Sequence, residues 1–189
     1  MSAECATSDL LLALVNTRPS DNGRVERFDG VPGLQAWLTD VGLAVAEPVT
    51  GADVVAAREL RDAFSSLFRA HCGCEDAPVE TAERYLHAVA ARYPLVLRVT
   101  AEGVTAEASQ TGVPGAFGTL LAAAADLSAR GAWPRLKLCK NPSCYAGFFD
   151  KTKNQSGQFC GSACGSQVSM RAYRSRQRTT PTPTTPTTV

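Results

Sequence analysis

Four cysteines in the last third of the chain constrain its fold more than any other feature. Cys139 and Cys144 are separated by four residues, and Cys160 and Cys164 follow with three residues between them. Pro142 can turn the backbone so that the first two sulfurs point at one ion. Residues at i and i+4 share a helix face, so the second pair converges if Cys164 opens a helix. The spacing therefore predicts a tetrahedral site for one Zn²⁺ ion.

Two alternatives to zinc fit the same cysteines. An iron–sulfur cluster also takes four thiolate ligands. Free buried thiols need no metal, but so small and polar a module would then have little to hold it together. A structural zinc site supplies folding free energy on the order of 10–16 kcal/mol. Because four thiolates leave no open coordination position, we expect a structural zinc whose purpose is to position the following helix.

The chain divides near Pro134 into two parts of opposite charge. Residues 1–134 contain 10 Lys and Arg against 17 Asp and Glu, a net charge of −7. Residues 135–189 contain 9 Lys and Arg and one acid, Asp150, a net charge of +8. This asymmetry is typical of a basic, nucleic-acid-binding end on an acidic body, although a basic module docked on its own acidic domain also explains it.

The segment after Cys164 is a candidate basic helix. Gln167, Arg171, Arg174 and Arg178 recur at i, i+4, i+7 and i+11 and so share one face. Arg176, Tyr173 and the loop lysines Lys137, Lys140, Lys151 and Lys153 complete a surface suited to phosphates and base edges. The predicted nucleic-acid contacts are Lys151, Lys153, Gln167, Arg171, Arg174, Arg176 and Arg178. A helix that arginines merely keep soluble is the alternative.

Residues 1–134 predict a helix-dominated α+β domain. Apolar spacing indicates helices around 34–38, over 53–71, after Pro78 and over 115–130, with Leu86, Val89 and Ala90 as the buried stripe of the third. A short apolar element spans 10–17, and the segments 95–100 and 104–109 predict a β-hairpin. Residues 135–178 then form the treble-clef-like zinc finger, and 179–189 a disordered Thr/Pro tail.

The stretch from Cys139 to Arg178 resembles the CGNR zinc-finger family. It has the order Cys-x4-Cys, Phe148 or Phe149, Asp150, Asn154, aromatic-Cys-x3-Cys-Gly and Tyr-Arg-x-Arg. The preceding residues resemble the ABATE domain that usually accompanies this finger, chiefly through Leu-Ala-Leu-Val-Asn-Thr at 12–17 and the Leu34/Trp37/Leu38 helix. The resemblance implies a bacterial stress-related transcription regulator whose finger binds DNA.

The chain departs from the pattern that names the finger family. Where Cys-Gly-Asn-Arg is expected it has Cys164-Gly165-Ser166-Gln167, and Gly157 and Phe159 replace the usual Arg and Trp. If the two missing arginines contact phosphate in the family, each lost contact is expected to lower the salt slope of binding by roughly 0.9.

We therefore expect a DNA-binding regulator with a structural zinc; the alternative is a zinc-stabilised protein–protein interaction module. RNA also fits the basic surface. No enzyme is expected, because the chain has no glycine-rich phosphate loop, nucleophile elbow or metal–histidine motif. His71-Cys72-Gly73-Cys74 reads as a helix end rather than a second metal site. Asn16, Thr17 and Arg18 are the candidate residues for a small effector or a protein partner.

The sequence also predicts a cytoplasmic protein. The apolar run at 10–15 is short and follows acids rather than a basic stretch, so it is unlike a secretory signal. No apolar segment reaches the roughly 20 residues that cross a bilayer. In a reducing compartment, the seven cysteines are expected to serve as metal ligands and free thiols rather than as a disulfide framework.

Overall fold

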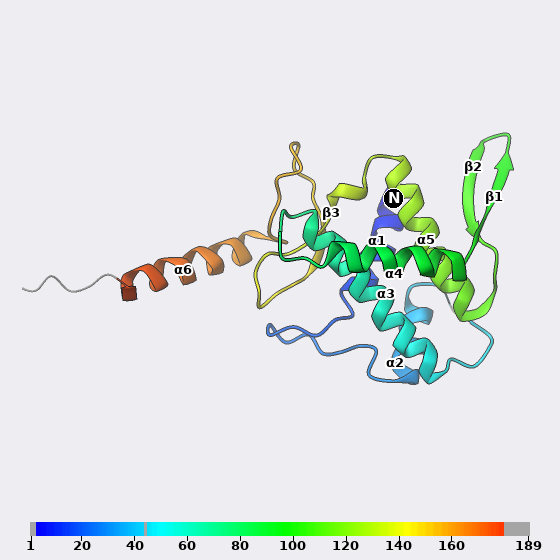
Figure 1. The fold of residues 1–189 in the computed structure, drawn as a ribbon, viewed down its shortest axis with the longest axis horizontal. Coiled ribbons are helices and arrows are strands. Elements are labelled where there is room, and N and C mark those ends of the chain that lie inside the picture. The colour runs from blue at the N-terminus through cyan, green and yellow to red at the C-terminus, as the bar shows by residue number, and fades with distance from the viewer. Residues whose placement is uncertain (1–2, 44, 180–189) are drawn as a thin grey trace, which may run out of the picture.

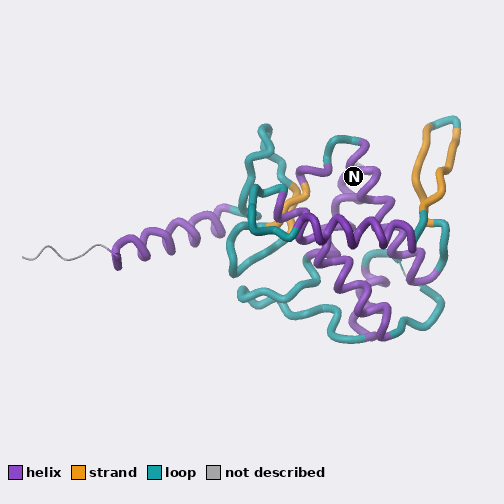
Figure 2. The backbone as a smooth tube through the Cα atoms, viewed as in Figure 1, coloured by secondary structure: helices purple, strands orange, loops and turns teal. Residues whose placement is uncertain are grey.

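A computed structural model describes residues 3–43 and 45–179, with side chains for 7–43 and 45–177. About half of the chain is helical, and two short antiparallel hairpins accompany the helices (Figure 2). This is the α+β, helix-dominated fold that the sequence predicts. Of the predicted tail at 179–189, Thr179 is the last residue of a helix, and residues 180–189 lie outside the described residues. No helix among the described residues is long and apolar enough to cross a membrane.

Five helices build the body of the molecule: α1 (Ala3–Val15), α2 (Val31–Asp40), α3 (Gly51–Ala70), α4 (Val79–Arg92) and α5 (Gly112–Ala129). Helix α3 begins at a capping box in which Thr50 and Asp53 satisfy each other's backbone N–H groups. Its apolar face packs against α1, α2 and α4. Trp37, which the sequence places in the core, is fully buried and meets Phe28 edge to face. One core thus unites the helices.

Two details of the body differ from the sequence pattern. The buried stripe of α4 is Ala82 and Val89 with half-buried Tyr85 and Leu86, whereas Ala90 is exposed, so its predicted burial is wrong. Helix α4 packs mainly on α3, and Ala90 lies on the part of α4 that faces solvent. The predicted hairpin is confirmed as β1 (Leu95–Thr100) and β2 (Gly103–Ala108), which lie at one edge of the body with β2 packed against α5 (Figure 1).

The C-terminal part contributes to the same core before it leaves the body. A single 3₁₀ turn, η1 (Trp133–Arg135), leads into β3 (Leu136–Leu138), which pairs with β4 (Gly147–Phe149). Strand β3 packs on α3, and strand β4 packs on α1. Leu136 and Leu138 are buried in the core of the body. Helix α6 (Ser162–Thr179) then points away from all the other helices (Figure 1).

Candidate zinc site and basic helix

A tight loop between β3 and β4 carries the first two cysteines. The backbone N–H of Cys139 donates to Ala146 O at 2.8 Å, and that of Cys144 donates to Asn141 O at 2.8 Å. Tyr145, directly after Cys144, has a left-handed backbone with φ of 46°, which a bulky residue adopts only when its surroundings impose it. This loop, residues 139–145, is called the knuckle below. It turns both sulfurs inward, as the Pro142 turn predicts.

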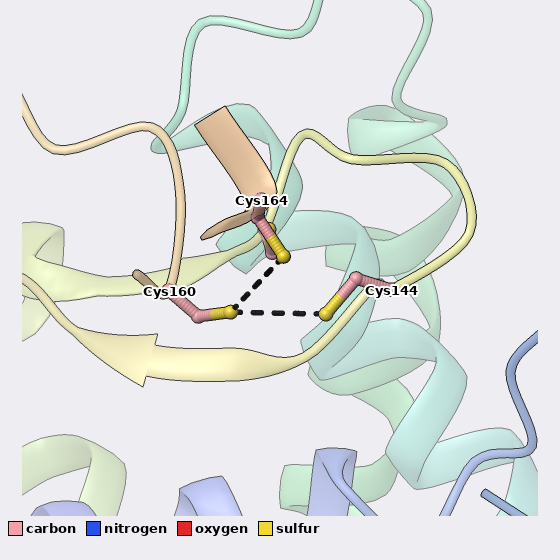
Figure 3. Close-up of side chains that lie close together, drawn as sticks. Cys144, Cys160 and Cys164 are labelled. Atoms are coloured by element: carbon pink, nitrogen blue, oxygen red, sulfur yellow. Dashed lines mark hydrogen bonds between the residues drawn. The ribbon is translucent and has the colours of Figure 1, made fainter. Parts of the chain in front are cut away.

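The second pair meets the knuckle from the start of α6. The Cys160 sulfur lies 3.7 Å from that of Cys144 and 3.7 Å from that of Cys164 (Figure 3). All four sulfurs, including that of Cys139, lie within 4.8 Å of one another. A tetrahedral Zn²⁺ with Zn–S bonds of about 2.3 Å places its sulfurs about 3.8 Å apart. The donor set and its spacing therefore fit one zinc ion.

The acid–base chemistry of the thiols also favours a cation at this point. Burial and then the charge of Cys139 raise the pKa of the Cys160 thiol, and burial raises the pKa of Cys139. In contrast, a hydrogen bond with the Asn141 side chain lowers the pKa of Cys164. Without an ion, the thiolates cannot all form beside one another. A divalent cation removes that repulsion and keeps all four deprotonated.

Hydrogen bonds from the knuckle fix the direction of α6. The Asn141 side chain is buried, and its amide donates to Oε1 of Gln167 at 2.9 Å. Arg171 donates to the Ser143 hydroxyl at 3.0 Å and to Oδ1 of Asn141 at 3.4 Å. Gln167 and Arg171, both predicted to contact nucleic acid, are exposed residues that also hydrogen-bond to the knuckle. These hydrogen bonds hold the start of α6 on the knuckle.

A buried ion pair supports the loop between β4 and the second cysteine pair. Lys137 is 2% exposed and donates to Oδ2 of Asp150 at 2.7 Å and to Gly157 O at 3.1 Å. Burial alone would raise the pKa of Asp150, but hydrogen bonds from Lys137, Thr152 and Gly157 hold that pKa well below its usual range. The prediction that Lys137 belongs to the basic outer surface is therefore wrong, because its charge is neutralised inside the finger.

Gly157 has a packing role that its sequence position does not reveal. A Cβ placed on Gly157 would lie 2.7 Å from Oδ1 of Asp150 and 2.8 Å from its carboxyl carbon. The Gly157 N–H donates to the same carboxylate at 2.8 Å. Gly157, which stands where the family pattern has an arginine, is thus in close contact with Asp150. A larger residue there requires the loop to shift.

The polar cluster at the end of α1 joins the body to the finger. The Asn16 side chain donates to Gly147 O at 3.1 Å and accepts from Gly147 N at 2.9 Å. Arg24 donates to Oδ1 of Asn16 at 2.8 Å and to Cys144 O at 2.6 Å. Thr17 is buried, and its hydroxyl donates to Leu14 O at 2.7 Å. Asn16 and Thr17 therefore have partners within the protein, whereas Arg18 is exposed.

The helix end at 71–74 also touches the finger. Nδ1 of His71 lies 2.8 Å from Leu136 O, and the Cys72 thiol donates to Leu138 O at 3.0 Å. These contacts hold β3 against α3. Their role is packing and hydrogen bonding, consistent with a helix end.

The remaining predicted contact residues are on the outside of the finger. Lys151 and Lys153 lie in an exposed loop, and Arg174 and Arg176 are exposed on α6. The side chain of Arg178 lies outside the described set. Sequence reasoning missed Asn141 and Arg24, because their roles depend on hydrogen bonds between residues far apart in the chain. For Asn141, the available sequence signal was that an Asn side chain often accepts a hydrogen bond from the backbone N–H two residues later. Asn141 accepts such a bond from Ser143.

A strand–knuckle–strand unit followed by a helix, with four cysteines meeting at one point, defines a zinc finger of the treble-clef-like kind. Residues 135–177 match the CGNR zinc finger family. Residues 8–131, about two thirds of the chain, match the ABATE family, described as "Putative stress-induced transcription regulator". The chain therefore belongs to the ABATE family, and Cys139, Cys144, Cys160 and Cys164 form the zinc site of its CGNR finger. No curated protein matches the chain.

Proposed function

We propose that the protein is a transcription regulator that binds duplex DNA through α6 and acts in the reducing cytoplasm, where its thiolates persist. The observation that carries this proposal is the placement of charge. Helix α6 contains Arg171, Arg174, Arg176 and Arg178 and no acid, and it points away from a body whose net charge is −7 (Figure 1). DNA phosphates can thus approach the arginines without approaching the acidic surface.

The length of α6 suits this role. Its 18 residues span about 27 Å, and a helix fits the major groove of B-DNA, which is about 12 Å wide. Residues 172–177, which follow Arg171, are all exposed, so this outer half receives little support from the body. An unsupported helical segment this short is marginal in water. Contact with DNA would stabilise the outer half, whereas Gln167 and Arg171 hold the inner half on the knuckle.

The test is fluorescence anisotropy of the zinc-loaded full chain with duplex DNA over a range of salt. The variant Arg174→Gln with Arg176→Gln removes two charges from the outer half of α6. It is expected to lower the magnitude of the salt slope by about 2 and to weaken binding at least about tenfold at low salt. The matched control, Arg98→Gln with Arg130→Gln, removes two exposed charges from the body and should bind like the wild type. Equal loss in both variants contradicts the proposal.

The second candidate, a protein-interaction module, is favoured by a different feature of the same helix. Met170 and Tyr173 are 51% and 54% exposed and lie one turn apart on α6. Paired apolar anchors of this kind dock into grooves of partner proteins. This function predicts a protein complex that is insensitive to salt and is lost in Met170→Ala with Tyr173→Ala. It also predicts no duplex binding at low salt.

A further inference from the structure

A cavity of about 270 Å³ lies at the junction of the body and the finger, outside the zinc site. Helix α3 contributes Ser65, Ser66 and Arg69, the loop after α1 contributes Arg18, and the finger contributes Leu138 and Tyr145. The two finger residues are each the direct neighbour of a zinc ligand, Cys139 and Cys144. Any molecule in this cavity would touch the body and the knuckle together.

Two guanidinium groups give the cavity a positive character. Arg69 pairs with Asp76 at 2.6 Å, and its guanidinium carbon lies 5.5 Å from the centre of the Tyr145 ring. Arg18 has no hydrogen bond or ion pair to any other described residue. Both arginines are charged at every physiological pH, and the single carboxylate of Asp76 balances only one of them. The cavity therefore has an uncompensated positive charge, which an anion would neutralise.

The serine hydroxyls narrow the chemistry further. Ser65 donates its proton to Arg61 O at 2.8 Å, and Ser66 donates to Asp62 O at 3.0 Å. A hydroxyl has one proton and two lone pairs, so both serines offer the cavity acceptors only. Among the other lining residues, Arg18, Arg69 and Tyr145 have side chains that can donate. A matching ligand combines an oxyanion with a hydroxyl donor.

We propose that this cavity binds a small phosphate monoester of a hydroxyl-bearing molecule. The phosphate contacts Arg18, Arg69 and the Tyr145 hydroxyl, since planar guanidinium groups bind phosphate through paired hydrogen bonds. The ligand hydroxyl donates to Ser65 or Ser66. The volume is just below the range of roughly 300–1,000 Å³ typical of drug-sized ligands, so the ligand is smaller than these.

The left-handed backbone of Tyr145 supports a binding role for this position. Its φ of 46° costs conformational energy in a residue with a large side chain, and such strain is concentrated at binding sites. Because the ligand would bridge α3, the Arg18 loop and the knuckle, it would tighten the junction between body and finger. This site does not depend on whether α6 binds DNA.

Isothermal titration calorimetry of the zinc-loaded full chain with glycerol 3-phosphate tests the proposal. Arg18→Gln is the informative variant, because Arg18 has no partner in the described structure whose loss would disturb the fold. Zinc content and circular dichroism check that the variant is folded. Its dissociation constant should rise at least about tenfold, the usual effect of losing a charge-assisted hydrogen bond. Arg174→Gln, which removes one exposed arginine from α6, should bind like the wild type.

Three outcomes would overturn the proposal. The first is equal affinity in Arg18→Gln and the wild type, and the second is no heat of binding at millimolar probe. The third comes from an arm with duplex DNA. If duplex displaces glycerol 3-phosphate and Arg18→Gln weakens duplex binding as well, Arg18 and Arg69 contact the phosphates of the nucleic acid instead. Inorganic phosphate, tested in parallel, should bind more weakly than the ester because it lacks the hydroxyl-bearing part that donates to Ser65 or Ser66.

Discussion

The buried ion pair of Lys137 and Asp150 supports the finger from inside. Asp150→Ala leaves the Lys137 ammonium inside the finger without its carboxylate, which is expected to cost about 3–5 kcal/mol of unfolding free energy. Urea unfolding of the zinc-loaded protein measures this loss. The control is Glu107→Ala, which removes the ion-pair partner of Arg98. The side chains of Arg98 and Glu107 are 66% and 47% exposed, so this variant should lose less than about 1 kcal/mol of unfolding free energy. Similar losses of unfolding free energy in the two variants would show that the ion pair of Lys137 and Asp150 does not stabilise the finger.

His71 is expected to make the protein less stable in mild acid. Burial, and to a lesser extent the charge of Lys137, lowers the pKa of His71 below its ordinary value of 6.5, although its hydrogen bond to Leu136 O acts in the opposite direction. The unfolded chain therefore binds the proton first. Neutral His71 therefore makes its full contribution to the unfolding free energy above about pH 6.5. This contribution is lost as the pH falls from there toward the folded-state pKa of His71.

The variant His71→Gln separates this effect from other titrations. It removes the titrating ring, so its unfolding free energy should fall less than that of the wild type between about pH 7 and pH 5.5. His87→Gln, at an exposed position of α4, should keep the full pH dependence of the wild type. A wild-type pH dependence that His71→Gln leaves unaltered would show that His71 is not its source.

At the scale of elements, the end of α1 is bonded to β4, so the finger is not a loosely tethered module. Asn16 exchanges two hydrogen bonds with the backbone of Gly147. Asn16→Ala leaves both groups of Gly147 and the Arg24 guanidinium without this partner, and is expected to cost about 1–3 kcal/mol. Thermal or urea unfolding measures it. Asn22→Ala, in the exposed loop that follows, should cost less than about 0.5 kcal/mol; an equal cost would contradict the bridging role.

The elements and the zinc ligands could be predicted from the sequence because their signals are local. Apolar spacing identified α3 and α5, and cysteine spacing identified the metal site. The positions that sequence reasoning placed wrongly, Ala90 and Lys137, depend on which neighbour each meets in space. Whether a lysine is on the surface or in a buried ion pair is decided by Asp150, which follows 13 residues later across the hairpin. The spacing of apolar residues along the chain does not reveal such an ion pair.

At the scale of the whole molecule, zinc is expected to support the body as well as the finger, because β3 belongs to both. Cys160→Ser should reduce the zinc content from one ion per chain to near zero and lower the thermal unfolding midpoint. Metal analysis and calorimetry on the same preparation measure the two effects. Cys74→Ser is the matched control, since Cys74 is half-buried and outside the cluster of four sulfurs. A variant at Cys160 that keeps its zinc would contradict the ligand assignment.

We propose that the zinc site presents α6 to the phosphates of duplex DNA. The salt dependence of duplex binding by the zinc-loaded wild type measures this contact. Up to five cationic contacts, from Lys151, Lys153, Arg174, Arg176 and Arg178, predict a slope of log Kobs against log salt between about −2 and −4.5. A slope near zero, or no binding at low salt, would contradict the claim.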